Sequence, residues 1–189
     1  TQLSIIESYP EYIFGASQPQ HYQFMKDQYP EIYAKIKEAV KSGNWEVQGG
    51  MWVEADCNLI SGESMVRQLL HGKNFFKDEF DIVVDNLWLP DVFGYSAALP
   101  QILKRAGVNY FLTQKLSWSQ FNDFPHQTFN WRGIDGTEIL THSPPENTYN
   151  SELDTEFLLP AQKGFKEKDR LNEFISLFGV GDGGGGCLL

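Results

Sequence analysis

The chain has 189 residues, of which 41% are hydrophobic and 21% charged, and its formal net charge is -10. This composition is ordinary for a globular domain with its own core. The lysines and arginines form no cluster that could follow a phosphate backbone, and no apolar run approaches the ~18 residues of a membrane span. The sequence therefore predicts neither a nucleic-acid partner nor a membrane partner, and it leaves the oligomeric state undetermined.

The cysteines and the aromatic residues give weaker indications. Cys57 and Cys187 are far apart and lack a partner motif. We expect free thiols in a reducing compartment, which predicts a cytoplasmic protein. Aromatic residues make up 14% of the chain. Core packing accounts for rings of this kind in general, although a carbohydrate site would also use aromatic faces.

Short apolar segments alternate with helical patterns in the first half of the chain. Residues 12–14 predict a strand, after which one helix is expected to be capped by Ser17 and a second to run from Pro30 to Gly43. Residues 45–54 carry another strand signal. A long helix follows over about residues 63–80, and its apolar side is expected to contain Val66, Leu69, Leu70 and Phe76.

The second half continues the alternation. Residues 82–88 and 109–113 predict two strands, separated by a helix that Ser96 caps and Gly107 ends. Residues 129–140 predict an inserted hairpin. After a polar stretch with a short helix or loop, residues 171–178 predict a helix end and a last short strand. Alternating strands and helices predict an α/β fold with mainly parallel strands, either an open sheet or a (β/α) barrel.

The segment from Asp85 to Ser96 is the most informative for chemistry. An apolar strand runs into Pro90-Asp91, then an aromatic residue, a glycine and a helix start. This order places Asp91 at the carboxyl end of a strand, where α/β folds collect catalytic groups. An ordinary turn residue is the alternative interpretation, but the flanking Pro90 and Phe93-Gly94 favour a rigid, specially shaped loop.

This segment resembles the nucleophile motif of family 38 α-mannosidases, because Trp88, Asp91, Phe93, Gly94 and Ser96 match a Trp–x–x–Asp–x–Phe–Gly–x–Ser pattern. Three further blocks resemble the cytosolic branch of that family, and the resemblance as a whole extends over nearly the whole chain. These blocks are Trp52-Val53-Glu54-Ala55-Asp56-Cys57-Asn58, Phe111-Leu112-Thr113-Gln114-Lys115-Leu116-Ser117-Trp118 and Gly181-Asp182-Gly183-Gly184-Gly185-Gly186.

The resemblance implies a partial (β/α) barrel-like glycoside hydrolase domain and a retaining reaction on mannose-containing oligosaccharides. The residue matching Asp91 would be the nucleophile and also a ligand of a divalent metal, zinc first and cobalt as an alternative. Asp182 would be the general acid/base, since retention needs one ionised and one protonated carboxyl group. Without the resemblance, Asp182-Gly183 would be interpreted as a plain turn.

Further candidates for substrate binding follow the predicted strands. Trp52, Glu54 and Asp56 alternate, so one strand would project all of them to one side, with a surface loop as the alternative. Lys115 and Trp118 follow the fourth strand; His142 and Tyr149 follow the hairpin. For His142, a hydrogen-bonded structural histidine is the competing interpretation, and His21, His71 and His126 have no partner spacing.

The chain departs from the family pattern at its metal shell. A His–x–Asp pair is expected before these blocks and a histidine after them, and neither occurs in the sequence. We therefore expect residues 1–189 to be one domain truncated at both ends, inactive alone, with the remaining metal ligands outside it. The alternatives are a metal-dependent carbohydrate deacetylase, in which Asp91 would be a ligand or base, and a non-catalytic product.

Overall fold

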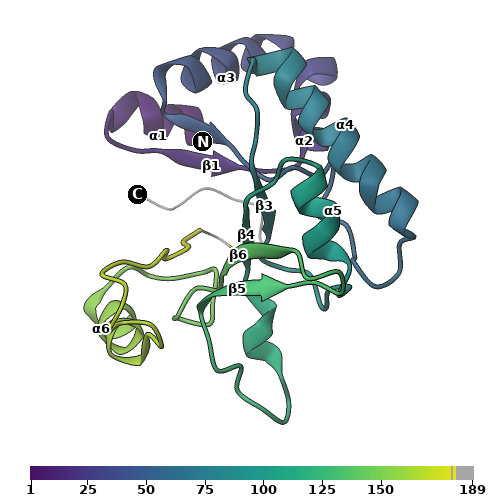
Figure 1. The fold of residues 1–189 in the computed structure, drawn as a ribbon. Helices are drawn as coiled ribbons and strands as arrows, with labels where there is room; N and C mark the ends of the chain where they lie inside the picture. The colour runs from purple at the N-terminus through teal and green to yellow at the C-terminus, as the bar shows by residue number, and fades with distance from the viewer. Residues whose placement is uncertain (180, 182–189) are drawn as a thin grey trace.

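The computed structural model describes residues 1–179 and 181 and shows helices packed against strands that run mostly in one direction (Figure 1). The strands are β1 (Phe14–Ala16), β2 (Trp45–Val47), β3 (Asn86–Leu89), β4 (Tyr110–Thr113), β5 (Thr128–Arg132) and β6 (Glu138–His142). The helices are α1 (Gln2–Ser8), α2 (Pro19–Gln28), α3 (Pro30–Ser42), α4 (Gly62–Phe80), α5 (Leu99–Arg105), the 3₁₀ helix η1 (Lys115–Trp118) and α6 (Thr155–Gly164).

The strands form two sheets. β1 pairs in parallel with β2, and the larger sheet has the order β3-β4-β6-β5, in which only β5 is antiparallel. After β2 the chain contacts β3, where the Gly49 N–H donates a hydrogen bond to Asn86 Oδ1 at 2.8 Å. The α/β class with mainly parallel strands and an inserted hairpin is confirmed. Closure into a barrel is not seen among the described strands.

Local sequence signals explain the helix ends that matter most. Pro30 begins α3, and Gly43 ends it at φ 85°, a left-handed conformation that glycine adopts without steric cost. The Ser61 hydroxyl caps α4 by accepting from the Ser64 N–H. The proposed Ser17 cap is wrong: α2 starts after Gln18 at φ 63°, and the Ser17 hydroxyl donates instead to Glu54.

Two apolar clusters fill the space between helices and strands. One joins α4 and α5 to β3, β4 and β6 through Leu69, Leu87 and Leu103, and the other joins α2, α3 and α4 to β2 through Tyr22 and Phe76. The predicted apolar face of α4 was partly wrong. Leu69 and Phe76 are buried, but Val66 and Leu70 are 45% and 51% exposed, and Met65 and Phe75 are buried in their place.

Other expectations need correction. Ser96 does not cap α5 directly, because the helix begins at Leu99 and the Ser96 hydroxyl accepts from the Ala98 N–H before it. Residues 52–56 and 171–178 form no strand. Cys57 is a buried free thiol, as predicted, and burial raises its pKa to about 11. Cys187 lies outside the described residues.

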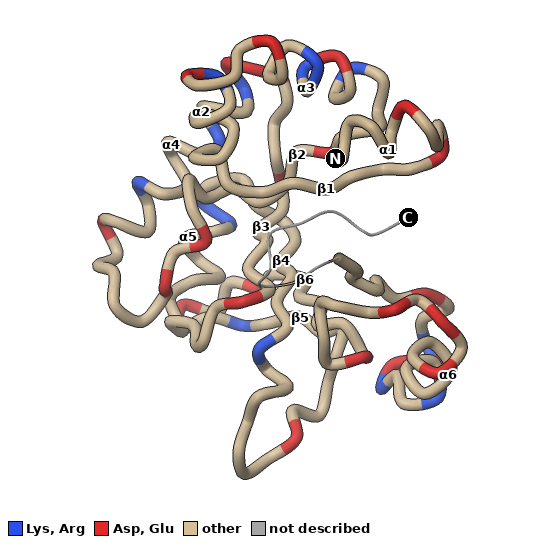
Figure 2. The backbone as a smooth tube through the Cα atoms, turned by 180° about the vertical axis from the view of Figure 1, so that it is seen from behind, with Lys and Arg blue, Asp and Glu red and all other residues tan. Residues whose placement is uncertain are grey.

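Charged residues are spread along the helices and loops rather than gathered in one segment (Figure 2). Helices α2, α3, α4 and α6 each carry both basic and acidic residues, whereas α5 carries only the basic Lys104 and Arg105. The net charge of -10 is therefore a general surface property. None of the helices in the described part of the chain combines the length and the apolar character that crossing a bilayer requires.

One close backbone contact positions the segment after β2. At Gly72 of α4, an added Cβ would lie 2.3 Å from the Gly50 oxygen and 2.8 Å from the Trp52 nitrogen. The Trp52 N–H also donates to the Gln68 carbonyl at 3.0 Å, so residues 50–52 lie directly on the helix. A side chain larger than hydrogen at this position would push them away from it.

We predict that Gly72→Ala lowers the free energy of unfolding by about 1–3 kcal/mol, the usual cost of overpacking. Gly62→Ala on the same helix is the control, since an added Cβ there meets nothing within 4 Å. It should leave stability unchanged or raise it by about 0.4–1 kcal/mol. Urea denaturation of both variants measures the difference. Equal midpoints for the two would contradict the close contact.

Candidate active site

The site is organised around an ion pair between two strand ends. Asp91 follows β3 and Lys115 follows β4, its parallel neighbour, so both lie at the same edge of the sheet. Lys115 Nζ lies 2.8 Å from Asp91 Oδ1. The lysine side chain is 3% exposed, whereas the aspartate side chain is 42% exposed. The carboxylate therefore faces solvent from a partner that is nearly buried.

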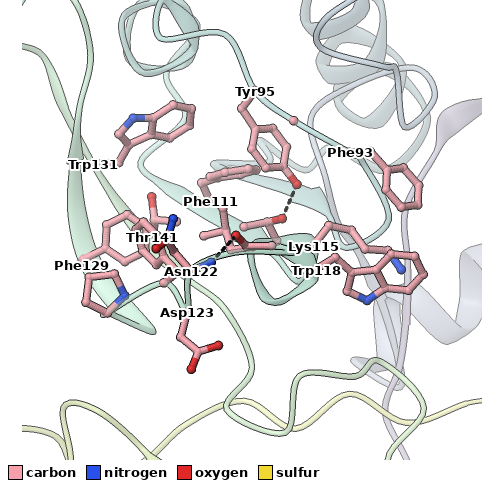
Figure 3. A pocket seen from close by; sticks show the side chains of 16 residues that line it. Phe93, Tyr95, Phe111, Lys115, Trp118, Asn122, Asp123, Phe129, Trp131 and Thr141 are labelled. Carbon is pink, nitrogen blue, oxygen red and sulfur yellow. Dashed lines mark hydrogen bonds between the residues drawn. The ribbon is translucent and has the colours of Figure 1, made fainter.

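Three aromatic rings surround the Lys115 ammonium. Its nitrogen is 3.8 Å from the centroid of Trp118, 4.6 Å from that of Tyr149 and 5.1 Å from that of Phe93. Figure 3 shows Lys115 and Trp118 side by side, with Phe93 next to them. A desolvated cation over aromatic faces gains about 2 kcal/mol or more. These contacts stabilise the buried charge together with Asp91, and we call this group of rings the aromatic cage.

The loop that carries Asp91 depends on Gly94. Its φ of +127° is strained for other residues, and a Cβ there would lie 2.3 Å from Asn58 Nδ2. The same Asn58 amide donates to the Phe93 carbonyl at 3.3 Å. Next along the chain, the Tyr95 hydroxyl shares a hydrogen bond with Thr113 and donates to the Val92 carbonyl. The loop is thus held to the end of β4 on one side and to residue 58 on the other.

A cavity of about 730 Å³ opens beside the aromatic cage (Figure 3). Thr113 and Thr141 line it, and they project from the sheet face on which Leu89 packs, since Thr113 is paired with Leu89. Phe93 and Lys115 also line the cavity but Asp91 does not, so the cavity lies next to Asp91 rather than around it. Its walls are mainly aromatic: Phe93, Tyr95, Phe111, Trp118, Phe124, Phe129 and Trp131.

Glu54 is a second carboxyl group near Asp91. Ser17 Oγ donates to Glu54 Oε1 at 3.0 Å, and the Glu54 N–H donates to Gln18 Oε1 at 3.3 Å. Burial raises the pKa of Glu54 above its ordinary value, the Ser17 hydrogen bond opposes this, and the negative charge of Asp91 raises it further. Two carboxyl groups at one strand edge thus have different environments.

The neighbours of Glu54 in sequence are placed differently. Trp52 donates from Nε1 to Gln20 Oε1 at 2.9 Å and lines a hollow on α4 with His71 and Phe75. Asp56 is exposed and accepts from the N–H groups of residues 58 and 59, as in an ordinary turn. The expectation that these residues share one strand face is wrong and the loop alternative holds, because residues 52–56 form no strand.

His142 ends β6 on the other face of the sheet from Thr141. Its Nε2 accepts from the Ile175 N–H at 3.3 Å, so the ring proton sits on Nδ1 and is donated to Thr128 Oγ1 at 2.8 Å. Burial lowers the pKa of His142, which keeps the ring neutral. The structure therefore gives His142 two protein partners. Asp182, the expected acid/base, lies outside the described residues.

The described donor groups form no complete metal site. Residues 1–179 and 181 contain no group of three histidine, cysteine or carboxylate side chains that could hold an ion. Asp91 has an exposed carboxylate, which suits a ligand, but the described residues do not complete a metal site around it.

Comparison with known proteins decides the family. The model of the glycosyl hydrolases family 38 N-terminal domain matches residues 1–188. The chain belongs to this family. It is 50% identical over 98% of its length to alpha-mannosidase G of Dictyostelium discoideum and 48% identical over 98% to alpha-mannosidase 2C1 of Homo sapiens. It spans only 17% and 18% of those two proteins.

A solved structure gives the same fold. The chain resembles an alpha-mannosidase from Enterococcus faecalis V583 with a TM-score of 0.67 and 24% identity, over 86% of this chain and 19% of that one. Family 38 membership places the protein among the glycoside hydrolases and favours the mannosidase interpretation over a deacetylase.

Sequence reasoning missed two parts of the site. Phe93 was noted only as part of a motif, yet its ring is 5.1 Å from Lys115 Nζ. Gln114 was named only as part of a matching block and was not proposed as a site residue, although it is buried at the base of η1. Phe93 could have been found from its place beside Asp91. No sequence signal distinguishes Gln114 from any other polar residue at a strand end.

We predict that Glu54→Gln raises the melting temperature at pH 7 and that the gain disappears near pH 4. Because the folded-state pKa of Glu54 is raised, the native chain binds more protons than the unfolded chain above the ordinary value of 4.5. Stability therefore falls as the pH rises from 4.5 through the raised folded-state pKa of Glu54. The neutral amide of the Glu54→Gln variant removes this loss. Calorimetry from pH 4 to 8 measures it, with exposed Glu11→Gln as the control. A pH-independent gain would contradict the assignment.

Proposed function

We propose that the chain carries the nucleophile part of an α-mannosidase site that hydrolyses α-linked mannose from oligosaccharides with retention of configuration. The observation that carries this proposal is the Asp91–Lys115 pair of 2.8 Å at adjacent parallel strand ends, in a family 38 chain. An exposed carboxylate held by a buried cation is oriented and remains accessible to a substrate. Those are the requirements for a nucleophile.

The proposed architecture is one catalytic domain of which residues 1–189 form a part. Successive parallel strands joined by helices, from β1 to β4, are the arrangement of a (β/α) barrel wall. The similarity to the Enterococcus faecalis enzyme supports the fold. In this proposal the two described sheets are arcs of one barrel, and strands from other parts of the longer protein complete it.

The reaction would proceed in two displacements. Asp91 attacks the anomeric carbon and forms a glycosyl ester, while Asp182 gives a proton to the leaving oxygen. Asp182 then takes a proton from a water molecule, and the oxygen of that water attacks the anomeric carbon, breaks the ester bond to Asp91 and frees mannose. Lys115 holds the Asp91 carboxylate in place before attack. The aromatic cage excludes water from the lysine, so the ion pair is stronger than an exposed one.

A divalent metal, zinc or cobalt, is also part of the proposal, with Asp91 as one of its ligands. Such an ion would hold vicinal sugar hydroxyls and act as a Lewis acid. The described residues supply no complete ligand set, so the other ligands are expected outside the described residues.

Sugar binding is assigned to the groups nearest to Asp91. Trp118 is 64% exposed and Phe93 58% exposed, so both offer free aromatic faces. Glu54, Lys115 and Tyr149 add polar atoms near them. Trp52, Asp56 and His142 remain proposed contacts, although their present partners lie within the protein. The cytoplasm is the proposed location, since alpha-mannosidase 2C1 is among the similar proteins and Cys57 is a free thiol.

The first test is the nucleophile assignment, made in the protein expressed from the complete reading frame that contains these residues. Asp91→Asn should abolish mannoside hydrolysis and prevent covalent labelling by 5-fluoromannosyl fluoride, because the attacking carboxylate is gone. Tryptic mass spectrometry should find the label on Asp91 in the unmodified protein. The control is Asp123→Asn, which changes an exposed carboxylate at the neighbouring cavity. This variant should keep both mannoside hydrolysis and covalent labelling. Labelling elsewhere would refute the assignment.

The second test concerns Asp182. Asp182→Asn should slow mannosides with poor leaving groups by about 10²–10⁴-fold, the usual contribution of general acid catalysis. Aryl mannosides with activated leaving groups should be much less affected in the glycosylation step, since their oxygen needs no proton. Steady-state and burst kinetics on both substrate types measure the difference. Equal losses on the two would show that Asp182 is structural.

A further inference from the structure

Gln114 joins two segments of the aromatic cage. It lies between β4 and η1 and is 1% exposed. Its Nε2 donates to Ser117 Oγ at 2.8 Å and to the Asn147 carbonyl at 2.5 Å. The amide therefore links the short helix after β4 to the turn after β6.

Each of these segments supplies a wall of the cage. The helix carries Lys115 and Trp118, and the turn leads to Tyr149. Their rings lie 3.8 Å and 4.6 Å from Lys115 Nζ. Asn147 has a φ of 56°, and its N–H donates to the Pro144 carbonyl at 3.1 Å, so the turn is tight and its carbonyl points to Gln114. Separating the segments would remove one wall of the cage.

The choice of glutamine is costly for stability. Its Oε1 is buried and has no hydrogen-bond partner among the residues that the structure describes. An unsatisfied buried acceptor costs about 1–3 kcal/mol, and an apolar side chain of similar size would avoid that cost. The two donor bonds of the amide are therefore the reason that a polar residue fits here. Both act on segments that contact Lys115.

We propose that Gln114 is a positioning residue for the nucleophile: it holds Trp118 and Tyr149 against the Lys115 ammonium, which in turn holds Asp91. This inference rests on the proposed role of Asp91. Without the link, the turn with Tyr149 moves away and water reaches the lysine. The ion pair then loosens, and the carboxylate samples orientations that cannot attack.

The test is the rate of covalent labelling of Asp91 by 5-fluoromannosyl fluoride in the protein from the complete reading frame. Gln114→Met keeps the length of the side chain and removes both donors. A misplacement of about 1 Å costs about 10²-fold, so we expect labelling to slow by roughly that factor. Gln101→Met is the matched control, because Gln101 also has a buried, unpartnered Oε1 but lies on α5 outside the cage. It should label at the normal rate.

A double-mutant cycle separates positioning from general destabilisation. Lys115→Met should slow labelling, and adding Gln114→Met to it should have no further effect, because the glutamine acts through the lysine. Trp118→Ala serves as a second variant, since this side chain is 64% exposed and its loss leaves the core intact. It should also slow labelling.

The outcomes distinguish this inference from the function on which it rests. Absence of any label on Asp91 in the unmodified protein refutes the nucleophile itself. Normal labelling of Asp91 in Gln114→Met, or additive losses in the cycle, overturns the positioning role while the nucleophile stands. Unchanged labelling in Trp118→Ala overturns the contribution of the cage.

Discussion

The site depends on one constraint, the burial of the Lys115 ammonium. Removing such a charge from water costs several kcal/mol, and one carboxylate that is 42% exposed repays only part of it. The aromatic rings, whose centroids lie 3.8–5.1 Å from Lys115 Nζ, and the ion pair must together stabilise the buried charge. Because the three rings come from the loops after β3, β4 and β6, keeping the lysine buried fixes those loops relative to one another.

Close backbone packing between α4 and the segment after β2 supports this arrangement. Gly72 lets residues 50–52 lie on α4, and the chain then brings Glu54 to the edge where Asp91 lies. Gln18 accepts a hydrogen bond from Glu54 while it has a φ of 63°, an unfavourable conformation for this residue. Strain, a half-buried carboxyl group and a buried cation therefore occur together, which is typical of a site selected for chemistry rather than for stability.

The sequence was a good guide where the determinants are local. Pro30 and Gly43 set the ends of α3, and the hairpin of β5 and β6 follows its turn residues. Asp91 was placed at a strand end because an apolar strand, a proline and a glycine stand in the right order. The sequence was a poor guide for residues 52–56. Their alternation resembles a strand, but the start of this segment lies on α4 at Gln68 and Gly72, and no local pattern contains these contacts.

The same distinction explains what could be predicted of the site. Lys115 was expected to bind substrate because it follows the fourth predicted strand, but its pairing with Asp91 depends on the register that sets β3 beside β4. The contact of Gln114 with Asn147 joins residues separated by 33 positions and requires the β4–β6 pairing as well. Individual strand ends can thus be recognised from sequence, whereas the geometry between them arises only when the sheet forms. In this protein Asp91 belongs to the first kind of information, and the groups that hold its carboxylate belong to the second.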